Sequence, residues 1–445
     1  MIKLTKIIAV ILSLILILSA CSPAGTETTQ NATDAPTTEE ITTEEITTEG
    51  NAASTGQTEE STESTEQTEG EPLSPEEQIL EDRRNAVVEA MRSMVTVLWR
   101  AEEDIDYSIA SGAKFSIKQG RIYRGMPYTN ACGTLASFLE YAGAPDENGI
   151  VTISGLKSGA MSGGGAKTAR IGNDCSSTVT RAWSVIGASI QFNISASCCE
   201  DKGAVKVGEY ETDPSTSKYT GQAVITNGRE VMGAAYAKLQ KGDALVRSGE
   251  GGNHMMMVVG TDVFYDKDGK VDLKKSIVTI LEQTSSRVMG NKFYYDEKLG
   301  ENVYEIGGVE IRYSFLTLYE KDYLPFTCKE LIDPSPVEAP YVTDSEETYT
   351  LDSIFVGTIS SNWFIDSVTV TVKDTKDNIV QEATGRVSRN YNRAFNLQQF
   401  LTDPADSIKG KVDPNELAAG QYKCVVVCRL TSGQELVARE FVFTK

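Results

Sequence analysis

A helical alternation of hydrophobic and polar residues follows the start signal Ser74-Pro75-Glu76-Glu77. The signal combines a serine cap, a proline at the first helical position and a glutamate at the third. Apolar residues then recur at helical spacing, at Leu80, Val87, Met91, Met94 and Leu98. This pattern predicts a structural helix that packs one apolar stripe against the rest of a domain.

A second helix is predicted where the loop Asn173-Asp174 turns into Cys175-Ser176-Ser177. Val179, Trp183 and Ile186 fall on one face of that helix, so it can be buried while its first residue, Cys175, stays at a cleft. Two shorter helices are expected at Ala131–Ala142, with Cys132 in the core, and near Val231–Leu239.

Strand patterns dominate the second half of the chain. A glycine-rich turn enters an apolar strand at His254; the strand runs to Tyr265, breaks at 266–269 and resumes over 276–283. Two or three further strands are expected between Val303 and Thr327. Prolines near 334–340 mark a linker, and residues 341–445 alternate short β-rich runs with turn signals, which resembles a bacterial immunoglobulin-like sandwich.

The first 73 residues differ from the rest. Residues 1–20 have two lysines, an apolar run and then small residues, as in a secretory signal peptide. Leu18-Ser19-Ala20-Cys21 resembles the bacterial lipobox, which implies cleavage before Cys21 and lipid on its sulfur. The mature chain would then be anchored at the outer face of the cell membrane. Residues 21–73 are Thr- and Glu-rich, cannot bury a core and are expected to be a disordered tether.

Charge belongs largely to that tether. The 445 residues carry 63 acidic and 42 basic side chains, a net charge of −21, and 13 of the acidic residues lie in 22–73, where lysine and arginine are absent. The folded part is only mildly acidic, which argues against a nucleic-acid partner. One histidine and no CxxC motif argue against zinc, and the glycines of 143–170 lack a phosphate-binding pattern, so no metal or cofactor is expected.

Cysteine chemistry is the strongest functional signal. Cys175 opens a helix, where unpaired backbone N–H groups and the helix dipole favour a thiolate. A nucleophilic cysteine needs a neighbouring imidazole as base, and His254 is the only histidine of the chain. The alternatives are a small buried cysteine and a histidine that caps a strand. The pairing of Cys198, Cys199 and the other cysteines stays open, although Cys424 and Cys428 are too far apart along one strand to bridge.

Turn geometry suggests a third group to orient the imidazole. A hairpin centred on Asp268-Gly269 pairs position 254 with position 283. Glu282 and Gln283 would therefore lie opposite or diagonal to His254, and they are exclusive choices because successive residues face opposite sides of a sheet. We favour Glu282, since a carboxylate stabilises the imidazolium as well as orienting it.

These residues resemble the NlpC-type cell-wall endopeptidases and the related CHAP amidases. Asp174-Cys175-Ser176 resembles their Asp-Cys-Ser signature, and Lys241-Gly242-Asp243-Ala244-Leu245 followed by Gly252-Asn253-His254 resembles their two central strands. Leu281-Glu282-Gln283 is similar to the Glu-Gln of the CHAP branch, with Thr284 where an asparagine usually follows. Gly125-Met126-Pro127-Tyr128 is similar to the family's Gly-hydrophobic-Pro-Tyr motif, although the 47 residues from Tyr128 to Cys175 exceed the usual spacing.

The resemblance implies an α+β papain-like catalytic domain over 74–333, followed by the all-β sandwich over 341–445. It assigns Cys175, His254 and Glu282 as catalytic residues and places Tyr128, Asp174 and Ser176 in the substrate-binding pocket. The leading hypothesis is a lipid-anchored hydrolase that cleaves amide bonds in peptidoglycan. The alternatives are a non-catalytic surface lipoprotein that binds wall peptide or a protein partner through the same cleft, and a peptidase or transpeptidase acting on protein.

Overall fold

The computed structural model divides the chain into two units, residues 1–69 and 70–445. All residues that it describes lie in the second unit. They are residues 72–108, 114–129, 132–154, 171–188, 190, 203–212, 220–249, 252–286, 291–346, 349–350, 356–387, 393–402 and 408–445. The expected signal peptide, Cys21, the tether and Cys198-Cys199 fall outside these residues.

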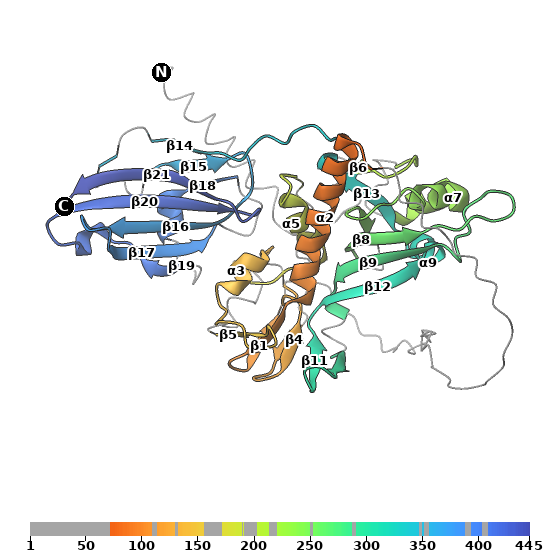
Figure 1. Ribbon diagram of the computed structural model, residues 1–445, viewed down its shortest axis with the longest axis horizontal. Coiled ribbons are helices and arrows are strands. Elements are labelled where there is room, and N and C mark those ends of the chain that lie inside the picture. Colours follow the sequence, from red (N-terminus) through yellow and green to blue (C-terminus); the bar gives the residue numbers. More distant parts are fainter. Residues whose placement is uncertain are drawn as a thin grey trace, which may run out of the picture. The chain divides into compact units, whose positions relative to one another are not determined.

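The described residues mix helices with a larger number of strands (Figure 1). The helices are α2 (Pro75–Thr96), α3 (Leu135–Leu139), α5 (Cys175–Ser184), α7 (Thr220–Tyr236), α9 (Phe315–Glu320) and α10 (Leu397–Thr402), with 3-10 turns η2 (Lys329–Leu331) and η4 (Pro414–Glu416). The strands before the linker are β1 (Leu98–Ala101), β2 (Ile105–Ser108), β3 (Lys114–Ile117), β4 (Ile122–Arg124), β5 (Val151–Ile153), β6 (Ala204–Lys206), β7 (Ala244–Arg247), β8 (His254–Asp262), β9 (Ile277–Gln283), β10 (Phe293–Asp296), β11 (Glu301–Glu305), β12 (Gly308–Ser314) and β13 (Leu324–Cys328).

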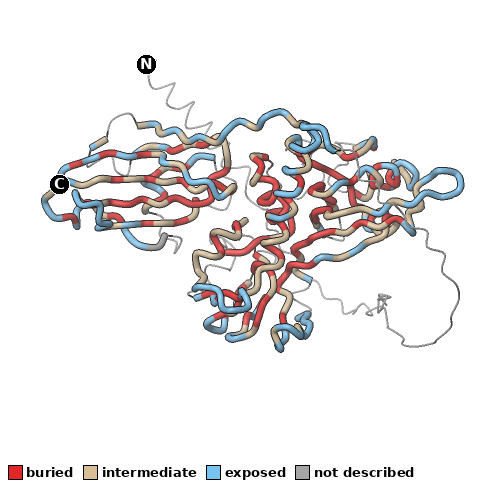
Figure 2. The backbone as a smooth tube through the Cα atoms, viewed as in Figure 1, coloured by how far each residue is buried: buried red, intermediate tan, exposed pale blue. Residues whose placement is uncertain are grey.

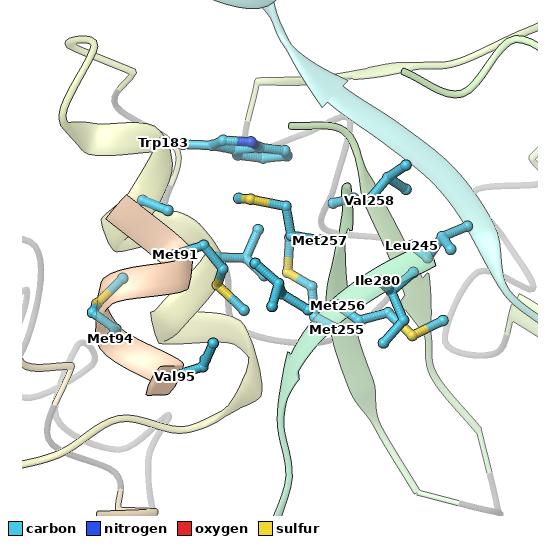
Figure 3. Packing of buried hydrophobic residues seen from close by; sticks show 14 of the residues in the cluster. Met91, Met94, Val95, Trp183, Leu245, Met255, Met256, Met257, Val258 and Ile280 are labelled. Carbon is cyan, nitrogen blue, oxygen red and sulfur yellow. The ribbon is translucent and has the colours of Figure 1, made fainter. Parts of the chain in front are cut away.

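A six-stranded sheet in the order β12-β9-β8-β7-β13-β6 carries the candidate site, and each neighbouring pair in it is antiparallel. Helices α2 and α5 pack on each other and on β8 and β9. β8 is buried over Met255, Met256, Met257 and Val258. Figure 3 shows Trp183 and Met91 on the helix side of this cluster, with Leu245 and Ile280 on the neighbouring strands. Helix α5, which begins with Cys175, is therefore held against β8 and β9.

A second sheet has the order β10-β11-β4-β1-β5, and β2 pairs with β3 in a separate hairpin. Trp99 of β1 is fully buried between Tyr123 and Phe138, at ring centroid distances of 5.1 and 5.4 Å. Its indole N–H donates to the carbonyl of Gly125. This packing fixes the segment that leads to Tyr128.

The C-terminal strands form two sheets of their own. Their strands are β14 (Val342–Asp344), β15 (Thr358–Ser361), β16 (Ile365–Lys373), β17 (Ile379–Arg386), β18 (Ala394–Asn396), β19 (Ile408–Lys411), β20 (Gln421–Leu430) and β21 (Glu435–Thr444). The sheet orders are β14-β15-β18 and β19-β17-β16-β20-β21. A separate hydrophobic core includes Val368, Val370, Val426 and the free cysteines Cys424 and Cys428. Alternating burial along β20 and β21 is visible in Figure 2.

Several sequence predictions about elements can be compared directly. The capping box at Ser74 is present, and the helix behind it runs from Pro75 to Thr96. The helix expected at 131–142 is wrong in extent, because Thr134 caps it and it spans only Leu135–Leu139. Cys132 therefore lies in a loop, with a positive φ of 53° and intermediate exposure, and not in a helix of the core.

Helix α7 spans Thr220–Tyr236, and Gly228, with a φ of 73° and a non-helical conformation, divides it into two helical parts. The helix expected near 231–239 corresponds to the second part, which ends at Tyr236. Among the described residues, no helix combines the length and the apolar character needed to cross a membrane.

Candidate active site

Cys175 is the first residue of α5, and its N-terminus is capped by a reciprocal pair of hydrogen bonds. The Asp174 carboxylate accepts from the backbone N–H of Ser177 at 2.7 Å, and the Ser177 hydroxyl accepts from the backbone N–H of Asp174 at 2.9 Å. Every residue of α5 is buried. Such a cap leaves the backbone N–H of Cys175, at the first helical position, without a partner inside the helix. This N–H is therefore available on the side of the helix where the thiol lies.

His254 is the first residue of β8 and lies between Cys175 and Glu282. Its Nε2 is 2.5 Å from Oε2 of Glu282, and the ring also hydrogen-bonds Cys175. Burial by itself lowers the pKa of His254, but the hydrogen bonds and negative charges of Cys175 and Glu282 outweigh it and raise the pKa to about 9. The ring of His254 is therefore an imidazolium across the neutral pH range, and it lies between the sulfur of Cys175 and the carboxylate of Glu282.

The strand register decides between Glu282 and Gln283. Met256 lies opposite Glu282, so position 254 pairs with 284 and not with 283 as the turn geometry predicted. Beside the turn, which includes a further turn at 273–275, the register is displaced by two residues, since Asp262 lies opposite Ile277; a β-bulge between Val258 and Gly260 then reduces the displacement to one. A slip of one residue exchanges the faces of a strand, so Glu282 lies diagonal to His254 on the same face. Gln283 faces away, and its side-chain N–H donates to the carbonyl of Met126 at 2.6 Å.

Tyr128 lies beside Cys175. It forms an isolated parallel bridge with Asn173, and its hydroxyl is within hydrogen-bond reach of both the thiol and the backbone N–H of Cys175. Burial, together with the nearby charges of Cys175 and Asp174, raises the pKa of Tyr128, which keeps the hydroxyl protonated. The structure therefore places the neutral hydroxyl of Tyr128, a hydrogen-bond donor, at the N-terminal end of α5.

Asp174 and Ser176 make local contacts. The Ser176 hydroxyl donates to the Asp174 carboxylate at 3.0 Å, and that carboxylate is also the cap of α5. Both side chains thus fix the orientation of the helix end that carries Cys175. A direct contact of either residue with a substrate stays a prediction.

Sequence reasoning missed Tyr323 and Arg247. The Tyr323 ring meets the His254 ring edge-on, with 6.4 Å between the ring centres. The guanidinium of Arg247 lies 5.6 Å from the centre of the Tyr323 ring. Arg247 is also the direct cross-strand partner of His254 in the β7–β8 pair. Only the order of the sheet brings Tyr323, which immediately precedes β13, to His254, and no local pattern carries that information.

Access to the sulfur is narrow, since Cys175 is 3% exposed and the side chains of His254 and Glu282 are 12% and 8% exposed. Burial strengthens the interactions among the three groups, because little water screens them. Within the described ranges, no group of three or more histidine, cysteine, aspartate or glutamate side chains is placed to hold a metal ion.

Comparisons with known proteins identify no family for this chain. No family model and no curated protein matches it. Among solved structures, it is similar to a crystal structure of a tetra-tandem repeat in the extending region of a large adhesion protein, at 15% identity and a TM-score of 0.17. That match covers 46% of this chain and 40% of the other, and at this level of similarity it carries no argument about function.

Proposed function

We propose that this protein is a lipid-anchored, extracytoplasmic cysteine hydrolase with a papain-like catalytic domain, which cleaves an amide bond in peptidoglycan peptides. The observation that carries the proposal is the chain of contacts from Cys175 through His254 to Glu282. These groups come from a helix and two strands, and they meet in the order that nucleophilic catalysis requires. Peptidoglycan as substrate rests on the resemblance of the motifs around Tyr128, Cys175 and His254.

Each group has one task in the proposed reaction. The Cys175 thiolate attacks the scissile carbonyl carbon, and the oxygen takes up the electron pair of the broken π bond. The backbone N–H of Cys175 and the Tyr128 hydroxyl, which lie within hydrogen-bond reach of each other, would donate to that oxygen. The imidazolium of His254 gives its proton to the leaving nitrogen as the C–N bond breaks, which leaves a thioester on Cys175.

Water completes the reaction. His254, now neutral, takes a proton from a water molecule that attacks the thioester, and the C–S bond breaks to release a carboxylic acid and the thiolate. Glu282 accepts a hydrogen bond from Nε2 throughout, which leaves Nδ1 of the ring for the thiol side of the site. The proton that returns to His254 restores the starting state.

The test is hydrolysis of purified cell wall by residues 70–445, which form a compact unit. Release of new amino groups by this form, and its loss in Cys175→Ala, would support the hydrolase, and the fragments would identify the bond. If neither form releases products, wall hydrolysis is wrong. Binding of both forms to the wall would then favour the non-catalytic lipoprotein, and cleavage of a protein substrate would favour the peptidase.

A further inference from the structure

The carbonyl of Cys132 accepts hydrogen bonds from two arginines that come from different parts of the chain. Nε of Arg181, on the nucleophile helix α5, donates at 2.7 Å. Nη2 of Arg386, at the end of β17 in the C-terminal sandwich, donates at 2.9 Å. One backbone oxygen therefore joins the sandwich to the helix that carries Cys175.

Asp366 of β16 holds the same loop at a second point. Its Oδ2 accepts from the hydroxyl of Thr134 at 2.7 Å, and its Oδ1 lies 3.7 Å from Nε of Arg386. Asp366 and Arg181 are each 2% exposed. Buried charges are costly to remove from water, and a broken buried pair costs more than a surface pair. The arrangement is therefore strongly sensitive to the loss of either partner.

The backbone of this loop and of the residues before it is hydrogen-bonded to the segment that leads to Cys175. The N–H of Gly133 donates to the carbonyl of Gly172, and the N–H of Thr129 donates to the carbonyl of Asn173, each at 2.9 Å. Gly172 leaves no space between the two segments, since a Cβ there would lie 2.2 Å from the carbonyl oxygen of Pro127. A displacement of the loop would thus reach Asn173, two residues before Cys175.

The conformation of Cys132 also requires support. Its φ of 53° is in the left-handed region, which is unfavourable for a residue with a Cβ. A cavity of about 190 Å³ lies beside the loop, lined by Thr134 and Arg181 on one side and by Leu430 and Gly433 of the sandwich on the other. The polar contacts at Cys132 and Thr134 join the two parts of the molecule next to this cavity.

We propose that the C-terminal sandwich positions the nucleophile, with Asp366 and Arg386 as the positioning residues that hold the loop 132–134 against the start of α5. Trp363, which precedes β16, packs closely on Gly187, which lies beyond the C-terminal end of α5 at Ser184; a Cβ added to Gly187 would lie 2.7 Å from the indole ring. The sandwich therefore also contacts the segment that follows α5. This inference rests on the proposed role of Cys175 as nucleophile, and it gives the sandwich a part in positioning that site.

The same junction offers a matched control. Arg429 of β20 pairs with Glu140 at 2.9 Å, at the C-terminal end of α3. Arg429→Gln removes a charged contact between the same two parts of the molecule without touching Cys132 or Thr134. A difference between this variant and Arg386→Gln separates positioning of the loop from general weakening of the junction.

The experiment measures the rate at which iodoacetamide alkylates Cys175 in residues 70–445, followed by peptide mass spectrometry. We expect Asp366→Asn and Arg386→Gln to lower the rate at about pH 7 by about tenfold or more, since small displacements of reacting groups have large kinetic effects. At about pH 10, where an ordinary thiol is ionised, their rates should approach that of the wild type. Arg429→Gln should stay within about twofold of the wild type at both pH values.

Arg386→Lys keeps one donor and the charge, and should recover part of the rate at neutral pH. It also tests the inference if Arg386→Gln fails to fold. Unchanged alkylation in folded Asp366→Asn and Arg386 variants, or equal losses in Arg429→Gln, would overturn the positioning role. Alkylation needs no substrate, so a failure of wall hydrolysis would refute the proposed function and leave this test intact.

Discussion

Replacing Glu282 by glutamine should lower the pKa of His254 and leave the shape of the site nearly unchanged. The wild-type pKa of about 9, against an ordinary value of 6.5, corresponds to roughly 3 kcal/mol at 1.36 kcal/mol per pH unit. A hydrogen bond to a charged group contributes about 1.5–3 kcal/mol. We therefore expect the pKa in Glu282→Gln to fall by about one to two pH units.

The measurement is unusually direct because the chain has one histidine. Its imidazole resonances can be followed by NMR between about pH 5 and pH 10 without any assignment by mutation. Cys175→Ala should also lower the pKa, since the thiol is the other hydrogen-bond partner that raises it. The two variants together separate the contributions of the two partners.

Glu310→Gln is the matched control. Glu310 lies on the neighbouring strand β12 and pairs with Arg92 at an exposed position, so the same chemical change removes a carboxylate that does not contact His254. The control should titrate as the wild type does. A change of less than about 0.3 pH unit in Glu282→Gln, equivalent to under about 0.5 kcal/mol, would refute the assignment of Glu282 as the partner of His254.

Three further predictions concern stability. Asp174→Ala removes the cap of α5 and should lower the free energy of unfolding by about 1 kcal/mol, measured by urea denaturation; a variant as stable as the wild type would contradict the capping role. Gly172→Ala should cost about 2 kcal/mol or more, since φ is +97° and Pro127 blocks the Cβ, and normal thermal stability would disprove this. The raised pKa of His254 implies stability that is complete below about pH 6.5 and is lost as the pH rises through about 9. His254→Gln should lack this decline, and parallel curves for both proteins would show that another group causes it.

Local signals predicted the elements that begin with a cap. Ser74-Pro75-Glu76-Glu77 starts α2, and Asp174 starts α5, because caps act over three or four residues and need no distant partner. The predicted length of α3 is too great because the apolar pattern of 131–142 extends beyond the short helix that Thr134 caps. The local apolar pattern alone predicts a longer helix than the one that forms in the context of its tertiary contacts.

The hairpin of His254 shows what turn chemistry leaves open. The turn near Asp268-Gly269 is present, yet an additional turn at 273–275 and a β-bulge between Val258 and Gly260 together leave the pairing at Glu282 displaced by one residue. A register error of one residue changes which side chain lies on the face of the sheet that carries His254, because it exchanges Glu282 for Gln283 there. Chemical preference for a carboxylate selected the residue that the backbone then placed beside His254.

The sequence by itself determined the residue types of the candidate site and their order along the chain: a cysteine at a helix start, one histidine at a strand start and a carboxylate near the end of the next strand. It also predicted a tether before the part that carries those residues and a β-rich region after it. Both are properties of spacing and composition, which are local.

Tertiary structure alone decided which groups surround them. Tyr323 reaches His254 because β13 lies beside β7 in the sheet. Arg386 reaches Arg181 through a shared carbonyl, although the two are far apart in the chain. Contacts of this kind depend on sheet order and on the packing between two hydrophobic cores, and no period or motif within either segment encodes them.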